Sequence, residues 1–199
     1  MTRQSLFVCV LGMGLLMGAV GQTPELGFCG VYETSGNFSA ELIAQIENSE
    51  ARFSFILSSG SSGGCKKLQL YSTGIYFYQT TDTLGNPLNV SSTVTMKPHS
   101  SSSPATIALS GLPFTELGAL LGSVTFNVLV AEKEKLVLLS CYNVGLIRFR
   151  QLHVLVAEEV SSSLSPHAVQ TELISMKVPL ASSLKQLPRS CFSSFSKSK

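Results

Sequence analysis

The sequence predicts an all-β domain, either a sandwich or a barrel, followed by a single helix. About eight short runs rich in β-branched and aromatic residues follow one another, and clusters of Ser, Gly and Pro separate them. One stretch near the C-terminus instead carries apolar residues at helical spacing. The length suits one domain with a real core.

The predicted strands can be placed in order along the chain. Two pairs of runs are expected hairpins, one turning at Ser72–Gly74 and the other at the charged segment Glu132–Lys135. A third turn, at Tyr142–Gly145, joins the last two runs. The strands are expected within residues 51–58, 67–71, 75–81, 88–97, 100–111, 123–131, 136–141 and 146–158.

The last of these strands has an unusual alternation. Arg148 and Arg150 share a parity with the apolar Leu152, Val154 and Val156. Side chains alternate between the two faces of a strand, so a β-bulge near residue 151 is expected to separate the two groups. Both arginines are then expected in solvent rather than as ligand anchors.

The predicted helix has a clear start and end. Ser165 is a good N-cap, and Pro166 suits the first helical position. Val169, Leu173 and Ile174, with Met176 near the edge, form a stripe that is expected to pack on the outside of the sheet. Pro179 ends the helix, and residues 183–187 are a candidate short last strand.

The N-terminus predicts secretion. Arg3 precedes an apolar stretch that ends in small residues at 19–21, which is typical of a cleaved signal peptide. We therefore expect a signal at residues 1–21, one domain at 22–192 and a flexible tail at 193–199 of an extracellular protein. Cys9 would leave with the signal.

Composition and motifs exclude several classes of protein. The formal net charge is +2, about +1 without Arg3, and no basic stripe favours nucleic acid. No later apolar run reaches the length of a membrane span. The sequence lacks GxSxG and HExxH, and the glycine-rich residues 59–64 lack the ending of a phosphate loop. We expect no enzyme, metal or cofactor, and His153 is predicted to be a wall residue.

Four cysteines remain in the mature chain, and an even number in a secreted protein indicates two disulfides. The sequence alone leaves open three ways of pairing these four cysteines. Two sequons, at Asn37 and Asn89, are candidate glycosylation sites. The cysteines are Cys29, Cys65, Cys141 and Cys191.

Three stretches resemble the lipocalins, in particular the apolipoprotein D-like branch. Residues 132–180 are similar to that family's seventh strand ending in Ser-Cys, its eighth strand and its helix. SSGGCKKLQLYSTGIYFY resembles the second strand with its turn, and GFCG lies where the family has its N-terminal cysteine. The resemblance covers about Gly27 to Cys191. It implies an eight-stranded antiparallel up-and-down barrel with one flanking C-terminal helix.

The chain departs from the family at the base of the barrel. It has no tryptophan, so the place of the family's Gly-x-Trp would fall to Phe53 or Phe55. The family's Thr-Asp-Tyr corresponds to residues 130–132, and its arginine at the end of the last strand corresponds to Glu158 or Glu159. Both partners of the family's packing pair are thus replaced.

The resemblance implies which cysteines pair and which residues line the interior. The pairs would be Cys29–Cys141, across the closed end, and Cys65–Cys191, along the outer wall. With Cys65 outward, Lys67 and Gln69 also face out. In the next strand either Tyr76 and Tyr78 or Ile75 and Phe77 face inward. We favour the tyrosines because a phenol can orient a ligand. The expected ligand-binding residues are Leu68, Leu70, Tyr76, Tyr78, Val94, Met96, Phe126 and Val128.

The implied function is transport of a small hydrophobic molecule, such as a lipid, retinoid, sterol, pigment or pheromone, inside the barrel. The alternative is a secreted structural or interaction protein whose barrel is filled and whose loops bind another protein. A cell-surface receptor is a partner that the sequence leaves unidentified. A small secreted enzyme would need a reactive residue inside the barrel, and we can nominate none.

Overall fold

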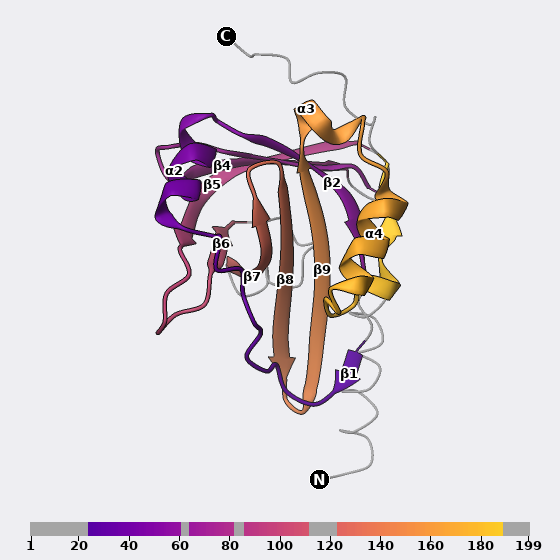
Figure 1. Ribbon diagram of the computed structural model, residues 1–199. Coiled ribbons are helices and arrows are strands. Elements are labelled where there is room, and N and C mark those ends of the chain that lie inside the picture. The colour runs from indigo at the N-terminus through magenta and orange to yellow at the C-terminus, as the bar shows by residue number, and fades with distance from the viewer. Residues whose placement is uncertain (1–23, 61–63, 82–85, 112–122, 189–199) are drawn as a thin grey trace.

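The computed structural model describes residues 24–60, 64–81, 86–111 and 123–188. Eight antiparallel strands, β2 to β9, follow one another around a closed barrel, and pairing of β9 with β2 completes it (Figure 1). Two short strands, β1 and β10, extend the sheet at β9 and β2. The predicted up-and-down barrel is confirmed.

The strands lie close to the predicted runs. The second hairpin turns between Glu132 and Lys135, as predicted. The third turn lies two residues beyond its expected start, because pairing continues to Val144 and Ile147. The bounds are β1 Pro24–Leu26, β2 Arg52–Ser58, β3 Lys66–Leu70, β4 Ile75–Thr81, β5 Pro87–Lys97, β6 Thr106–Ser110, β7 Ser123–Glu132, β8 Lys135–Val144, β9 Ile147–Ala157 and β10 Lys185–Gln186.

The predicted bulge near Gln151 is wrong. The β8–β9 register is continuous over the whole hairpin, so the even-numbered residues of β9 all face outward. Register shifts lie instead between Phe55 and Leu57 in β2 and between Val128 and Val130 in β7. The parity of β9 misled because this strand is apolar on both faces, with helix α4 covering the outer one.

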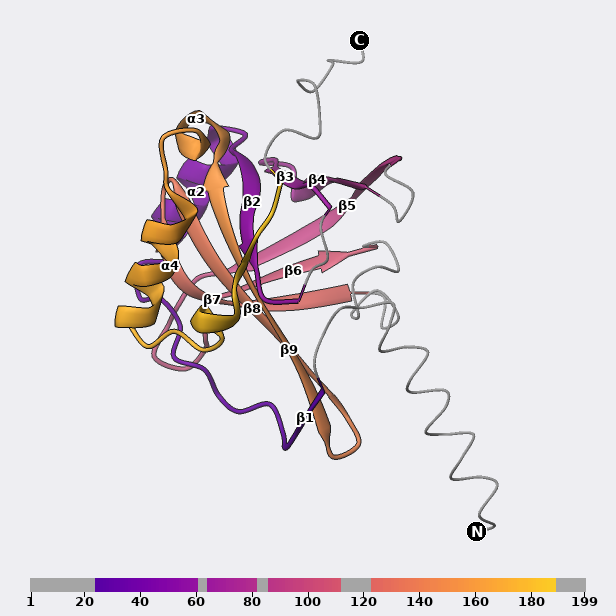
Figure 2. The same cartoon turned by 90° about the vertical axis from the view of Figure 1, so that its right-hand side faces the viewer.

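Helix α4, Pro166–Ser175, begins as predicted. The Ser165 side chain accepts a hydrogen bond from the Ala168 N–H, and Pro166 occupies the first turn. Val169 and Leu173 are buried against the outer face of β2, β8 and β9 (Figure 2). Ile174, expected in the same stripe, is 48% exposed. The chain then passes through a short 3-10 helix, η2 Ala181–Ser183, and β10.

Helix α2, Ala40–Asn48, was not predicted. The Ser39 side chain accepts a hydrogen bond from the Leu42 N–H and so caps its first turn. Its Ile43 and Ile46, with Phe38, are buried in the same cluster as the inward side chains of the strands. This helix therefore closes one end of the barrel. A single-turn helix, α3 Glu158–Ser161, follows β9 at the same end (Figure 1).

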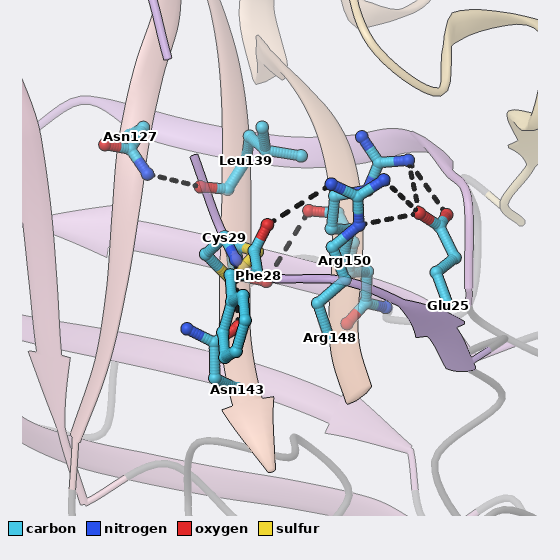
Figure 3. The surroundings of a disulfide bond; sticks show 11 residues. Glu25, Phe28, Cys29, Asn127, Leu139, Asn143, Arg148 and Arg150 are labelled. Carbon is cyan, nitrogen blue, oxygen red and sulfur yellow. Dashed lines mark hydrogen bonds and ion pairs between the residues drawn. A yellow bond between two sulfur atoms is a disulfide. The ribbon is translucent and has the colours of Figure 1, made fainter. Parts of the chain in front are cut away.

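The N-terminal segment is held on the outside of the barrel. β1 pairs with the start of β9, far from α2, and Cys29 forms a disulfide with Cys141 of β8 (Figure 3). The predicted pairing is confirmed, but its expected place across the closed end is wrong. Cys141 pairs with Arg150, near the β8–β9 turn. The N-terminal segment runs from β1 along the wall to α2 (Figure 1).

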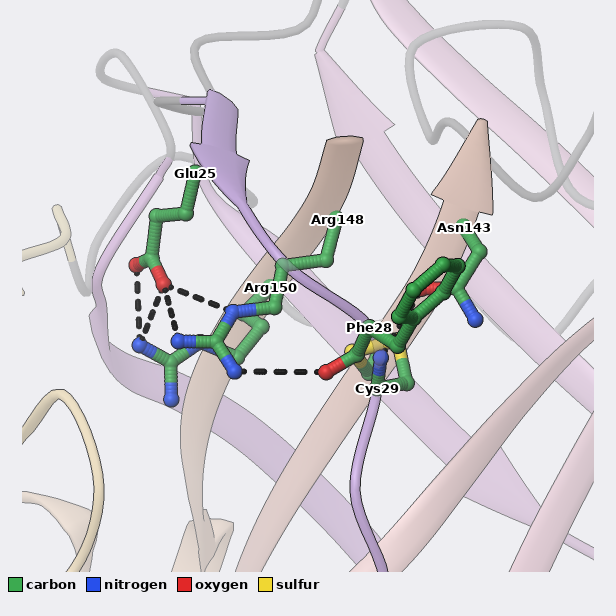
Figure 4. Close-up of polar contacts among 7 residues, drawn as sticks. Glu25, Phe28, Cys29, Asn143, Arg148 and Arg150 are labelled. Carbon is green, nitrogen blue, oxygen red and sulfur yellow. Dashed lines mark hydrogen bonds and ion pairs between the residues drawn. A yellow bond between two sulfur atoms is a disulfide. The ribbon is translucent and has the colours of Figure 1, made fainter. Parts of the chain in front are cut away.

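An ion cluster secures the same segment. The Glu25 carboxylate of β1 accepts hydrogen bonds from Arg148, at 3.0 Å, and Arg150, at 2.6 Å (Figure 4). Arg148 also donates to the Phe28 carbonyl oxygen at 3.3 Å. The arginines expected in solvent are thus half-buried partners of a carboxylate.

The remaining expectations fall partly outside the described residues. These include the signal at residues 1–21, the tail at 193–199 and Cys191. Cys65 is itself disulfide-bonded, and its Sγ lies 3.0 Å from the Pro188 carbonyl oxygen. Its pairing with Cys191 stays a prediction. None of the described helices is long and apolar enough to span a bilayer.

Candidate functional site

The candidate site is the interior of the barrel. Apolar side chains from all eight strands and from α2 form one buried cluster there. The predicted wall residues Leu68, Leu70, Tyr76, Tyr78, Val94, Phe126 and Val128 belong to this cluster, and Met96 packs against it. The structure brings all eight together, and their contact with a ligand stays a prediction.

The two tyrosines of β4 face inward, whereas Ile75 is 41% exposed. Burial raises the pKa of Tyr76 to about 12. The Tyr76 hydroxyl donates a hydrogen bond to the Ser110 carbonyl oxygen, so it retains only acceptor capacity for a ligand. The Tyr78 ring lies edge-on to Phe55, with ring centroids 6.0 Å apart.

His153 is the most central polar residue of the interior. It is 1% exposed, and its ring meets Phe55 edge-on at 5.4 Å and Phe126 at 6.0 Å between centroids. It pairs with Ser58 across β2 and β9, so the two residues share the inward face. The prediction of a wall residue agrees with this position.

Several further polar side chains face inward, and the sequence did not predict them. The Gln151 amide donates to the Ser58 hydroxyl at 3.4 Å, and the Ser140 hydroxyl donates to the Gln151 carbonyl at 3.5 Å. Lys66, 8% exposed, pairs with Thr80 and shares the parity of Leu68. The alternation of KKLQL, once Leu68 and Leu70 were set inward, already implied an inward Lys66.

The residues at which the sequence departs from the lipocalin pattern lie at the base of the barrel. Phe53, fully buried, pairs with Leu68 and Ala157 close to α2, and Phe55 lies one layer further in. Phe53 therefore occupies the layer nearest the closed end. Glu158 faces outward and forms a 2.6 Å ion pair with Lys67 of β3.

Two clefts lie outside the barrel. One, of about 420 Å³, is lined by residues 49–52 and 157–159 with Gln69, Lys133 and Glu134. The other, of about 400 Å³, lies between Arg150 and residues 180–185. In the described part of the chain no group of three or more His, Cys, Asp or Glu side chains is placed to hold a metal ion.

Both sequon asparagines are on the surface. Asn37 is exposed just before α2, and Asn89 is exposed on the outer face of β5. The third residue of the first sequon, Ser39, is also the N-cap of α2. Attachment of a glycan at Asn37 or Asn89 stays a prediction.

Three solved structures share this arrangement of strands. Apocrustacyanin C1 superposes with a TM-score of 0.55 at 11% identity, covering 86% of this chain and 92% of that one. Apocrustacyanin C2 and lobster apocrustacyanin A1 each give 0.54 at 10% identity, covering 83% and 91%. The fold is lipocalin-like.

At such low identity the likeness establishes the fold and nothing finer. No family model matches the chain, and no curated protein matches it.

Proposed function

We propose that the protein is a secreted carrier that holds a small hydrophobic molecule inside its barrel. The observation that carries this proposal is the single apolar cluster formed by the inward faces of all eight strands. Burying apolar ligand surface there contributes about 25 cal/mol per Å². Ordering of the ligand and the wall opposes this gain.

The packing of the interior limits the ligand. Seven of the eight predicted wall residues expose at most 7% of their surface, the largest value being that of Val94. A ligand must therefore be slender or must displace side chains as it enters. The proposal includes no chemistry on the ligand.

The same proposal includes secretion of the protein and its likeness to the apolipoprotein D-like lipocalins. The Cys29–Cys141 disulfide suits an oxidising, extracellular compartment. The narrower likeness to the apolipoprotein D-like branch rests on residues 132–180. A receptor on the cell surface remains an unidentified partner.

The close packing of the interior also favours a second candidate. A barrel filled by its own side chains would be a scaffold, and the protein would then act by binding another protein through its loops. The two functions differ in whether an added apolar molecule reaches the interior.

Single-tryptophan variants test this directly, because the protein has no tryptophan of its own. Phe126→Trp places the reporter in the interior cluster, and Phe77→Trp places a matched reporter on the outer face of β4. Titration with dodecan-1-ol is expected to shift the emission of the Phe126→Trp protein saturably and to leave that of the Phe77→Trp protein unchanged. An unchanged emission in both variants would favour the filled scaffold.

A further inference from the structure

The interior of the barrel is polar on one side. Six inward polar residues lie on five neighbouring strands, in the order β4, β3, β2, β9, β8. All six expose 8% or less of their surface. We call them the polar arc: Ser58, Lys66, Thr80, Ser140, Gln151 and His153.

The facing wall, on β5, β6 and β7, is largely apolar. Its members in the interior cluster come from three neighbouring strands. Ser92 of β5 also has the inward parity, because it pairs with the inward Tyr76. The cluster members are Val94, Ile107, Leu109, Val124, Phe126 and Val128, with Met96 packed beside them. A molecule inside the barrel would thus meet mainly hydrocarbon on one side, and on the other a group of hydrogen-bonding side chains.

The polar arc can carry positive charge but not negative charge. It contains an ammonium, an imidazole, an amide and three hydroxyls. In the described parts of the eight strands the only acidic residue is Glu132, which is exposed and pairs with Lys135. The interior therefore complements a ligand group that accepts hydrogen bonds and carries negative charge.

We propose, building on the carrier function above, that the ligand is a small lipid with a single carboxylate head. The carboxylate lies against the polar arc, where Lys66 supplies the charge and the amide and hydroxyl groups supply further donors. The hydrocarbon chain lies along the wall of β5 to β7. Lys66, Gln151 and His153 already take part in other interactions, and the proposal needs only that their donors face the interior of the barrel.

Two adjacent lysines on β3 provide a matched pair of variants. Lys66 faces inward and is 8% exposed, whereas Lys67 faces outward and pairs with Glu158 at 2.6 Å. Lys66→Met and Lys67→Met remove the same charge from opposite faces of one strand. Only the first is expected to alter recognition of a carboxylate.

The experiment compares dodecanoic acid with dodecan-1-ol, which has the same chain and a neutral head. Each displaces the neutral dye N-phenyl-1-naphthylamine from the full-length protein at neutral pH. We expect the acid to bind about tenfold more tightly, as a charge-assisted hydrogen bond allows. Lys66→Met should abolish this preference while the alcohol still binds, and Lys67→Met should preserve it.

The outcomes separate the two proposals. Equal affinity of acid and alcohol for the wild-type protein would overturn the carboxylate head and leave the carrier function standing. Loss of the preference in both lysine variants would also overturn the role of Lys66. If neither compound displaces the dye, or the dye itself does not bind, the carrier function falls and this inference falls with it.

Discussion

At the residue scale, the face of the strand on which a side chain lies decides what it contacts, more than its residue type does. Lys66 and Lys67 are neighbours of the same kind, yet Lys66 faces the interior of the barrel and Lys67 forms an ion pair outside. Phe53, at the closed end, is fully buried. These positions follow from register, so a shift by one residue would exchange them.

The ion cluster of Glu25 gives a pH-dependent prediction. The hydrogen bond from Arg150 lowers the pKa of Glu25 below 4.5, against the opposing effect of burial, and Arg148 adds to the lowering. Because folding lowers this pKa, the ionised Glu25 carboxylate stabilises the fold fully above pH 4.5. This contribution is lost as the pH falls through the lowered pKa. The half-buried pair is expected to contribute up to about 1 kcal/mol.

Glu25→Gln should therefore be less stable than the wild type at neutral pH, and the difference should vanish in acid. Urea unfolding at a series of pH values measures it. Glu33→Gln, an exposed carboxylate on the same segment, is the control. A deficit that stays constant down to strongly acidic pH would show that the ion pairs are not its cause.

Several of these residue positions could be predicted, and others could not. The inward set on β3 followed from alternation once the resemblance had fixed one face. On β4 alternation left two sets open, and the choice of the tyrosines rested on their phenol groups. The polar arc was missed because its members are spread over five strands that become neighbours only when the barrel closes. The pairing of Glu25 with two arginines more than 120 residues away had no local signal.

At the element scale, α2 shows how a short helix escapes sequence reasoning. Its nine residues bury only Ile43 and Ile46, and the stripe is too short to stand out beside the strands. The signal that could have found it is Ser39, an N-cap followed by apolar residues at helical spacing. Helix α4 was predicted because Ser165 and Pro166 mark its start and a longer stripe follows.

Loss of the α2 cap should loosen the closed end of the barrel. Ser39→Ala removes the acceptor for the Leu42 N–H and is expected to cost about 1 kcal/mol of unfolding free energy. Ser39→Thr keeps a capping hydroxyl and should cost less. The same residue belongs to the Asn37 sequon, so both variants should be compared in unglycosylated protein by urea denaturation.

If Ser39→Ala and Ser39→Thr unfold at the same urea concentration as the wild type, the Ser39 cap does not stabilise the protein. Hydrogen exchange gives a second readout. Amides of residues 42–46 should exchange faster in Ser39→Ala, whereas those of α4 should not change.

Strand β9 shows why alternation alone can mislead. A strand with solvent on one side reads as alternating apolar and polar residues, but a helix packed on the outer face makes both sides apolar. Leu152 and Val154 are fully buried outside the barrel, under α4. The change from arginines to aliphatic residues marks where this cover begins, and no bulge is needed.

At the scale of the whole molecule, the eight strands could be predicted but their closure could not. Runs of β-forming residues fit a sandwich as well as a barrel, and only the resemblance to lipocalins favoured the barrel. The decisive contact is the pairing of β2 with β9, residues about 100 positions apart. Propensity and alternation do not report pairing at such a distance.

The Cys29–Cys141 disulfide should dominate global stability. It joins residues 112 positions apart, and in the chain-entropy model such a link contributes about 4–5 kcal/mol. The double variant Cys29→Ala, Cys141→Ala should unfold at a clearly lower urea concentration under non-reducing conditions. Asn143→Ala, which removes only the acceptor for the Cys29 N–H, should have a much smaller effect.

A double variant as stable as the wild type would mean that the N-terminal segment is held by the ion cluster and β1 pairing alone. A loss restricted to residues 24–34, with the barrel still intact by hydrogen exchange, would place the effect in that segment rather than in the whole fold.

Native mass spectrometry of the protein secreted by cells shows whether the barrel holds a small hydrophobic molecule. One bound small molecule per chain is expected, recovered by extraction with organic solvent. A spectrum that shows only the polypeptide with its modifications, and that gains no mass after incubation with dodecanoic acid or dodecan-1-ol, would contradict this expectation.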